Sequence, residues 1–293
     1  MTDQILRAID PLGHVRFFVA DTTDMVEEMR NIHNASTTAT AAMGRVLTMM
    51  SILSLGLENP GDSITVNIKG GGPGGYLVGL TDGVGEARVT AERPEVDIPS
   101  REDGHLDVGG WVGRDGTLSL VRGYGMKKPF SGLTELVSGE IAEDFASYFF
   151  QSEQKPSIIS LGVLVEPDHH VSHAGGLFVQ LLPDHTEEDI EKLEDVLETL
   201  PSMTTMLSEG LTPEAILKEK FATLEPELLA TTQPHYVCHC SHQKMLDALL
   251  SIDEADRRQM AEEDGGAEVV CEFCRTAYHF SADELRREGE VWT

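Results

Sequence analysis

The chain has 293 residues, of which 50 are acidic and 22 basic, giving a formal net charge of −28. Hydrophobic residues make up 40% of it, which excludes a disordered protein and supplies cores for one large domain and a smaller one. The acid excess argues against a nucleic-acid partner, because phosphate binding relies on lysine and arginine.

Membrane and export signals are missing from the sequence pattern. There is no apolar run of about twenty residues, and no charged and then apolar segment opens the chain. We therefore expect no membrane partner and a cytoplasmic location. Reducing conditions in that compartment keep cysteines as thiols or metal thiolates rather than as structural disulfides.

The first fifty-odd residues predict one strand and two helices. The strand covers residues 14–20, and a helix begins near Thr23 with apolar residues on one face. A longer helix over residues 36–55 carries alanine and methionine at helical spacing. A row of methionines can form a flexible binding face, but we interpret this row as core packing.

The next segment predicts an antiparallel meander. Residues 63–69 alternate apolar and polar side chains, which is typical of a half-buried strand. The glycine-rich run 70–75 follows without the Gly-Lys-Ser/Thr of a phosphate loop, so we interpret it as a hairpin connection. Short strands are predicted over 85–91, 111–112 and 117–122.

A helix over residues 138–152 and two buried strands over 157–165 and 177–182 complete the predicted core. Three histidines lie between these strands beside proline and glycine. Their spacing matches no metal site that we can justify, and we interpret them as part of a solvated loop: His169, His170 and His173.

Composition changes at Pro183, which we take as the end of the first domain. Two amphipathic helices are predicted after it, one over 187–200 and one from 212. We expect an α+β protein with a sheet-and-helix core domain (1–182), a helical linker (183–233) and a small C-terminal domain (234–293). The linker helices carry apolar stripes that nothing local covers: Ile190, Leu193, Leu197, Ile216, Leu217 and Phe221.

All four cysteines lie in the C-terminal segment, in two close pairs. Cys238 and Cys240 form a CxC pair, and Cys271 and Cys274 form a CxxC pair after a long spacer. Such pairs can bring four sulfurs to one tetrahedral centre, as a structural zinc site requires. The sequence therefore predicts a metal site with these four ligands.

The full chain resembles the heat shock protein 33 family, redox-regulated holdase chaperones of the bacterial cytosol. The resemblance rests on several motifs and on the cysteine spacing: Ser138-Gly139-Glu140-Ile141-Ala142-Glu143-Asp144, Leu161-Gly162-Val163, Ala174-Gly175-Gly176, and Cys238-x-Cys240 with Cys271-x-x-Cys274 and Tyr278. It implies an α+β core, a helical linker and a zinc-binding switch, and also a dimer when active and transfer of clients to ATP-driven chaperones.

Three nearby histidines keep a mixed Cys/His ligand set open: His235, His239 and His242.

These observations lead to one hypothesis, an ATP-independent holdase that is not an enzyme. One zinc ion per reduced chain would supply the folding energy that a small segment lacks, and oxidant would attack the same thiolates. Each pair is close enough in sequence to close on itself, so we expect disulfides Cys238–Cys240 and Cys271–Cys274. Loss of the zinc module would then expose the linker stripes to unfolding client proteins.

Two alternatives compete with this hypothesis. A thiol-disulfide oxidoreductase could use the CxxC pair, but it would need that pair at the start of a helix in a thioredoxin-like setting. A zinc-ribbon module for nucleic acid would need a basic patch near the cysteines, which the sequence does not supply.

Overall fold

A helix buried on nearly every side forms the centre of the larger part of the molecule. In the computed structural model, which describes residues 2–124 and 129–286, this helix is α2 (Thr37–Ser54). All of its residues except Thr37 and Arg45 are buried. Ser36 begins it by accepting a hydrogen bond from the backbone N–H of Ala39. A helix that is apolar all round belongs inside a core, so the predicted methionine row is core packing.

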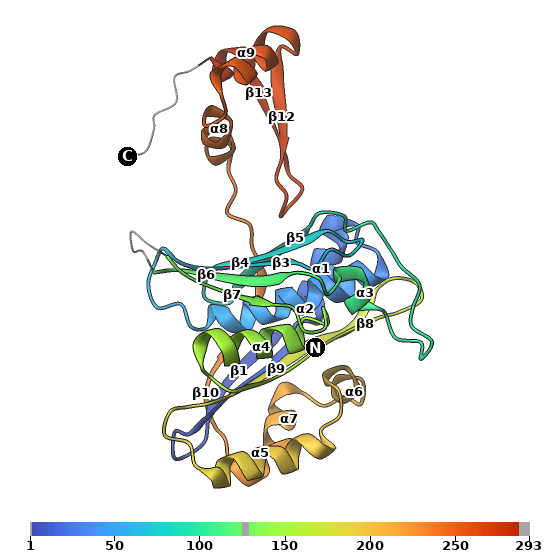
Figure 1. The fold of residues 1–293 in the computed structure, drawn as a ribbon, viewed down its shortest axis with the longest axis vertical. Helices are drawn as coiled ribbons and strands as arrows, with labels where there is room; N and C mark the ends of the chain where they lie inside the picture. Colours follow the sequence, from blue (N-terminus) through green and yellow to red (C-terminus); the bar gives the residue numbers. More distant parts are fainter. Residues whose placement is uncertain (1, 125–128, 287–293) are drawn as a thin grey trace. The chain divides into compact units, whose positions relative to one another are not determined.

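Two sheets enclose α2 (Figure 1). Their strands are β1 (Gln4–Ile9), β2 (Val15–Asp21), β3 (Asp62–Lys69), β4 (Tyr76–Gly83), β5 (Glu86–Ala91), β6 (Thr117–Tyr124), β7 (Phe130–Glu135), β8 (Ser157–Val165), β9 (Val171–Leu181), β10 (Glu227–Thr232) and β11 (His235–Tyr236). The first sheet has the order β10-β1-β2-β9-β8 and the second β11-β5-β4-β3-β6-β7. Every pairing is antiparallel except that of β11 with β5. The prediction of an α+β core with a meander is confirmed.

Three more helices belong to this core: α1 (Thr23–His33), α3 (Val108–Val112) and α4 (Ala142–Glu153). The strand predicted over 111–112 is wrong, because these residues end α3, whose first turn is capped by Asp107. Trp111 is fully buried, and a Cβ added at Gly74 would lie 2.4 Å from its ring. The connection from β3 to β4 is therefore rich in glycine because α3 packs too closely against it for a side chain to fit.

Residues 183–233 contain helices and a strand. The predicted helices are confirmed as α5 (Glu187–Thr199) and α7 (Pro213–Lys220), and a third, α6 (Met203–Ser208), lies between them. The stretch then ends in β10, which pairs with β1 at the edge of the first sheet. The chain divides into two compact units, 1–237 and 238–293, so the segment predicted as a separate linker lies within the first unit.

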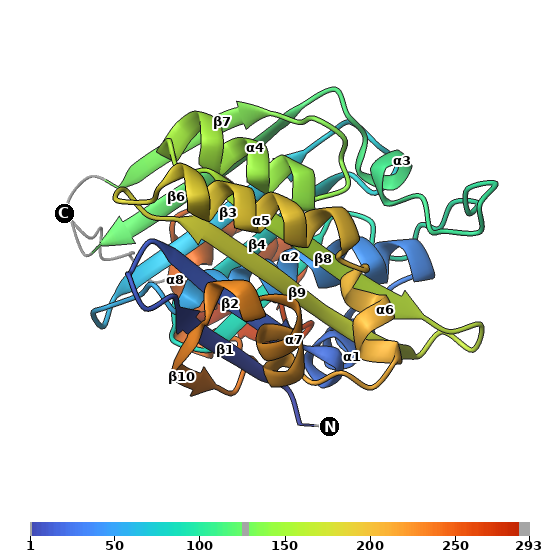
Figure 2. The same cartoon turned by 90° about the horizontal axis from the view of Figure 1, so that it is seen from below.

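The apolar stripes of α5 and α7 have a local cover, contrary to our expectation. They pack on the face of the first sheet that points away from α2 (Figure 2). The rings of Phe17 in β2 and Phe221 have centroids 5.3 Å apart, and Leu193, Ile216 and Leu217 are buried with them. The sheet can do this because β2 is apolar on both faces: Phe17 faces the linker helices, while Phe18 belongs to the core around α2.

The second unit is small. It comprises α8 (His242–Leu250), α9 (Glu254–Glu263), α10 (Ala282–Leu285) and a hairpin of β12 (Gly266–Val270) and β13 (Ala277–Ser281). Residues 287–293 of the predicted C-terminal domain lie outside the described part of the chain. Five buried residues form the core of the unit: Leu246, Leu249, Ala261, Phe280 and Leu285. In the described residues of both units, no helix is long and apolar enough to cross a membrane.

Two leucines of α5 allow a matched test of this packing. Leu193 is 3% exposed in the cluster on the sheet, whereas Leu197 is 38% exposed. We expect Leu193→Ala to lower the free energy of unfolding of the first unit by about 2–5 kcal/mol, because it leaves a cavity. Leu197→Ala should lower it by less than about 1 kcal/mol. Urea denaturation of both variants measures the difference, and equal losses would contradict the packing described.

Candidate metal centre

Two short segments place the four cysteines. Cys238 and Cys240 lie in the coil before α8, whose first turn is capped by the side chain of Ser241. Cys271 and Cys274 lie in the connection between β12 and β13. That connection is tightly turned: the N–H of Cys271 donates to the carbonyl of Thr276, and the N–H of Arg275 donates back to the carbonyl of Cys271, at 2.9 and 2.8 Å.

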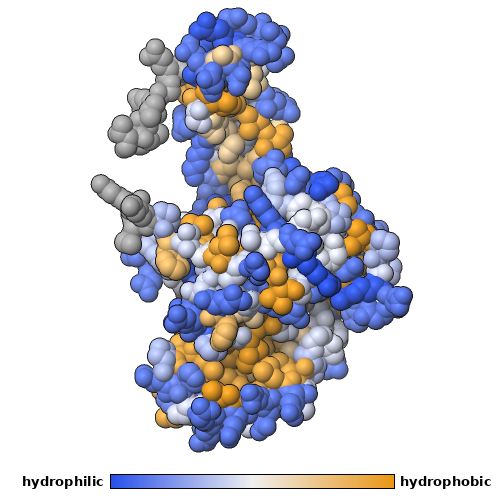
Figure 3. Space-filling view, in the orientation of Figure 1, coloured by the Kyte–Doolittle hydropathy of each residue, from blue (hydrophilic) through white to orange (hydrophobic). Residues whose placement is uncertain are grey.

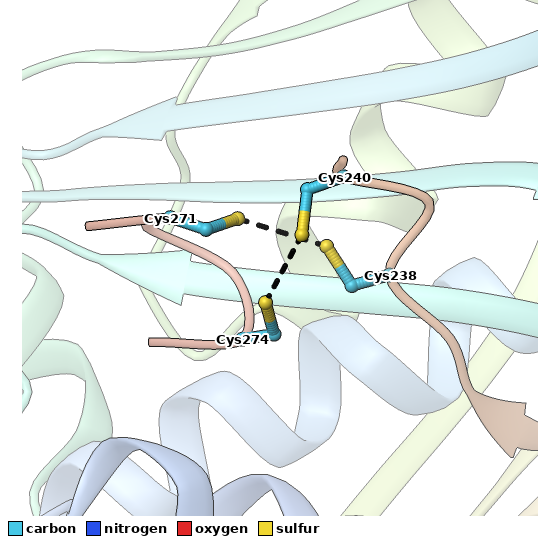
Figure 4. A group of neighbouring side chains, drawn as sticks. All are labelled: Cys238, Cys240, Cys271 and Cys274. Carbon is cyan, nitrogen blue, oxygen red and sulfur yellow. Dashed lines mark hydrogen bonds between the residues drawn. The ribbon is translucent and has the colours of Figure 1, made fainter. Parts of the chain in front are cut away.

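The four sulfur atoms converge on one point (Figure 4). All lie within 4.8 Å of one another, with Cys238 and Cys271 at 3.7 Å and Cys240 and Cys274 at 3.3 Å. A tetrahedral ion with metal–sulfur bonds of about 2.3 Å requires sulfurs about 3.8 Å apart. A disulfide requires about 2.05 Å, and all four cysteines are free thiols. The group therefore fits a tetrahedral metal ion with four thiolate ligands.

The protonation of the thiols depends on a cation. Burial raises the pKa of Cys238 and also that of Cys271, the most buried of the four at 5% exposure. Burial also opposes ionisation of Cys274, but hydrogen bonds with Thr276, Cys240 and Cys271 together outweigh it and lower the pKa to about 7. A divalent ion among the sulfurs reverses the effect of burial, since it favours four thiolates. A cation bound by the four sulfurs would therefore have to displace the thiol protons, as thiolate ligands require.

Two hydroxyl groups support the sulfurs from outside the ligand set. Tyr278 Oη lies 3.1 Å from Cys240 Sγ, and Thr276 Oγ1 lies 3.2 Å from Cys274 Sγ. The hydrogen bond to Cys240 raises the pKa of Tyr278 to about 12, so its hydroxyl keeps a proton to donate. A donor such as the Tyr278 hydroxyl orients a metal ligand and stabilises its charge, whereas the Cys274 thiol donates to Thr276 Oγ1. Sequence reasoning missed Thr276, although a hydroxyl two residues after a ligating cysteine is a usable signal.

The histidines near the first pair do not join the sulfurs. His235 belongs to β11, and His239 is exposed. His242 contacts the hairpin instead: its ring centroid lies 4.5 Å from that of Phe280, and its Nε2 lies 3.3 Å from the carbonyl oxygen of His279. In the described residues, the thiol group therefore consists of four cysteines and no histidine.

The distant histidines predicted as a solvated loop lie at the hairpin between β8 and β9. His169 and His170 are exposed in the turn, where His170 is hydrogen-bonded to Asp168, and His173 lies in β9. None of the three is in a metal-ligand group of the described residues. The solvated-loop interpretation holds for the turn but not for His173.

The chain thus combines an α+β unit with a small unit in which four cysteines are placed to hold a metal ion, and known proteins share this combination. The family model described as Hsp33 protein matches residues 3–281. The 33 kDa chaperonins of Clostridioides difficile and Alkaliphilus metalliredigens are 44% and 39% identical over 97% and 98% of this chain, each covered over 98% of its own length.

A solved structure agrees. The crystal structure of the 33 kDa chaperonin (heat shock protein 33 homolog) of Thermotoga maritima has a TM-score of 0.88 and 36% identity, covering 97% of both chains. The chain belongs to the Hsp33 family of chaperones, which confirms the resemblance seen in its motifs.

Metal binding by the reduced protein tests the ligand set. We expect one tetrahedral thiolate-bound Co²⁺ per chain on titration with Co²⁺, detected by its absorption spectrum. Cys271→Ser should abolish stoichiometric binding, because three thiolates and a neutral hydroxyl hold the ion far more weakly.

His242→Ala is the control and should bind Co²⁺ with unchanged stoichiometry and spectrum. A spectrum altered by this substitution would show that a histidine ligand replaces one of the cysteines.

Proposed function

We propose that the protein is a redox-regulated, ATP-independent holdase of the cytoplasm and not an enzyme. In the reduced chain, Cys238, Cys240, Cys271 and Cys274 hold one zinc ion, for which four thiolates in a tetrahedron are a preferred ligand set. The convergence of these four thiols carries the proposal, because a single chemical event, oxidation of sulfur, can abolish the whole site.

Zinc would supply the stability that the second unit lacks. Its core has five buried residues, which is little apolar burial for an independent fold. Zinc binding in small thiolate modules provides on the order of 10 kcal/mol or more, and this energy is folding energy. A second unit without metal should therefore unfold.

Oxidation would release the metal and form two disulfides. Peroxide takes two electrons from each pair of thiols, so that one S–S bond forms and two water molecules leave. The two sulfur distances of 3.7 and 3.3 Å both join one pair to the other, but a tetrahedral group brings all of its members close together, so these distances do not decide the pairing in the oxidised chain. Pairing within Cys238–Cys240 and within Cys271–Cys274 closes short loops, which constrain an unfolded chain little. The oxidised second unit would thus stay unfolded.

A short strand connects the metal centre to the linker helices along the chain. β11 ends at Tyr236, two residues before Cys238, and pairs with β5 through two residues only. The hydroxyl of Tyr236 donates to the carbonyl of Val89 at 3.0 Å and lies 3.1 Å from Nε2 of His33. When the second unit unfolds, this anchor is what resists further unfolding toward β10 and the linker.

The client-binding surface would include both sides of the contact between the linker helices and the first sheet. Of the six candidates named from sequence, Leu193, Ile216, Leu217 and Phe221 are buried on the sheet, Ile190 is half-buried and Leu197 is exposed. Figure 3 shows apolar side chains gathered between the sheet and the α5–α7 layer. Detachment of the linker would expose this apolar area on helices and sheet alike, and exposed apolar area binds unfolding proteins.

The charge and the family support the rest of the proposal. A net charge of −28 would keep complexes with clients dispersed. From the family resemblance we infer that the active form is a homodimer and that clients pass to ATP-dependent chaperones.

The alternatives fit less well. The CxxC pair lies in a hairpin connection rather than at the start of a helix, which disfavours a thioredoxin-like oxidoreductase. Relatives named chaperonins and the strong acidity disfavour a zinc ribbon that binds nucleic acid.

One oxidation experiment tests the proposal. Treatment with peroxide at mildly raised temperature should release one zinc per chain, remove four free thiols and switch on suppression of client aggregation without ATP. Peptide mapping should find Cys238 joined to Cys240 and Cys271 joined to Cys274.

The reduced, zinc-loaded protein is the control and should leave the client to aggregate. Equal protection by the reduced form would refute the switch. Disulfides between the two pairs would refute the proposed pairing, since they would close long loops and restrain the unit.

Tyr236→Phe tests the anchor. It removes a hydroxyl that bonds two buried groups, which costs about 1–3 kcal/mol, so the linker should detach more easily once zinc is lost. We expect half-maximal holdase activity at a lower peroxide dose or a lower temperature than in the parent protein. Tyr76→Phe is the matched control, because no described residue is hydrogen-bonded to the Tyr76 hydroxyl, and its response should equal the parent's.

A further inference from the structure

A large cavity in the first unit plays no part in the metal centre. It has a volume of about 950 Å³ and opens between β1, β2 and β9 of the first sheet, the end of α2, and β6, β7 and α4. Binding sites for small organic molecules have volumes of about 300–1,000 Å³. Much of its wall is apolar and includes Phe18, Phe130, Phe149, Phe178, Leu55 and Leu57.

The charge of the cavity is opposite in sign to that of the protein. Four of its lining residues are basic, whereas Glu58 and Glu153 are its only acidic ones, in a chain with more than twice as many acids as bases. Glu153 is committed to two of the cations: its carboxylate oxygens lie 2.7 Å from Arg122 Nη2 and 3.1 Å from Lys155 Nζ.

The two remaining cations, Arg7 and Arg16, form an ion pair with no residue that the structure describes. The guanidinium of Arg16 donates only to the neutral side-chain oxygen of Gln180 and lies over the ring of Phe18 at 5.6 Å. Burial lowers the pKa of Arg16, and the positive charges of Arg122 and Arg7 lower it further, against a smaller opposing effect of the negative charge of Glu153. An anion entering the cavity would relieve this repulsion.

We propose that this cavity binds a small organic anion with an apolar body, a medium-chain carboxylate or a molecule of the same chemistry. Arg16 and Arg7 compensate the carboxylate, and the phenylalanine and leucine walls enclose the hydrocarbon. A small inorganic anion would leave those walls wet, and an apolar molecule without charge would leave the two guanidinium groups unpaired. The cavity is therefore selective for a molecule that has both parts.

Calorimetric titration of the reduced, metal-loaded, full-length protein tests this proposal. In that state the proposed holdase is inactive, so binding to an exposed client surface does not contribute. Decanoate should bind saturably, whereas decyltrimethylammonium, which has the same chain length and the opposite charge, and acetate, which lacks the apolar body, should not. Arg16→Gln and Arg7→Gln should each weaken decanoate binding about tenfold or more, the loss expected for one charge-assisted contact.

Arg93→Gln is the control, because Arg93 is exposed and outside the cavity; decanoate affinity should stay within about twofold of the parent's. Arg7 is exposed, so its variant keeps the test valid if Arg16→Gln disturbs folding, which circular dichroism would reveal. The proposal is overturned if decanoate does not bind saturably, if the cationic analogue binds equally well, or if Arg7→Gln binds decanoate like Arg93→Gln.

Discussion

The second unit depends on one constraint: its four cysteine sulfurs lie at distances that suit a tetrahedral metal ion. Burial raises the pKa of Cys238 and of Cys271, so their thiolates need a cation nearby. The surrounding core has five buried residues, which is little apolar burial for an independent fold. In the proposed zinc-bound state, metal binding would contribute directly to the fold stability of this unit, and chemistry that removes the thiolates would remove both.

In the first unit, the helices on the two faces of the sheet that contains β2 differ in how far their stability depends on packing against that sheet. One face of this sheet is covered by α2, an 18-residue helix with core on all sides, and the other by α5, α6 and α7, which have 13, 6 and 8 residues. Isolated helices of this length are only marginally stable in water, so α5, α6 and α7 depend on packing against the sheet for their structure. The cover formed by α2 is therefore part of the core, whereas in the proposed switch α5, α6 and α7 would detach and unfold together to form a conditional binding surface.

Sequence reasoning identified what is local and missed what is long-range. The cysteine spacing fixed all four members of the thiol group, and apolar periodicity located α2, α5 and α7. The cover of the linker stripes was missed because β2 reads as one apolar run, which does not reveal that Phe17 and Phe18 serve different cores. β10 was missed because its partner, β1, lies more than two hundred residues earlier, with Ile5 opposite Thr232. Periodicity cannot show such pairing.

The two dependences make the proposed switch a sequence of two steps. Loss of zinc would remove folding energy from the second unit directly, and along the chain it would reach the linker through β11 and β10. Those strands retain their own contacts: the Tyr236 hydroxyl with Val89, and the pairing of β10 with β1. In the proposed switch, oxidation would thus prepare release, and a further input that weakens strand pairing and helix docking, such as heat, would complete it. A chaperone built in this way would respond to oxidant most strongly under the conditions in which its clients unfold.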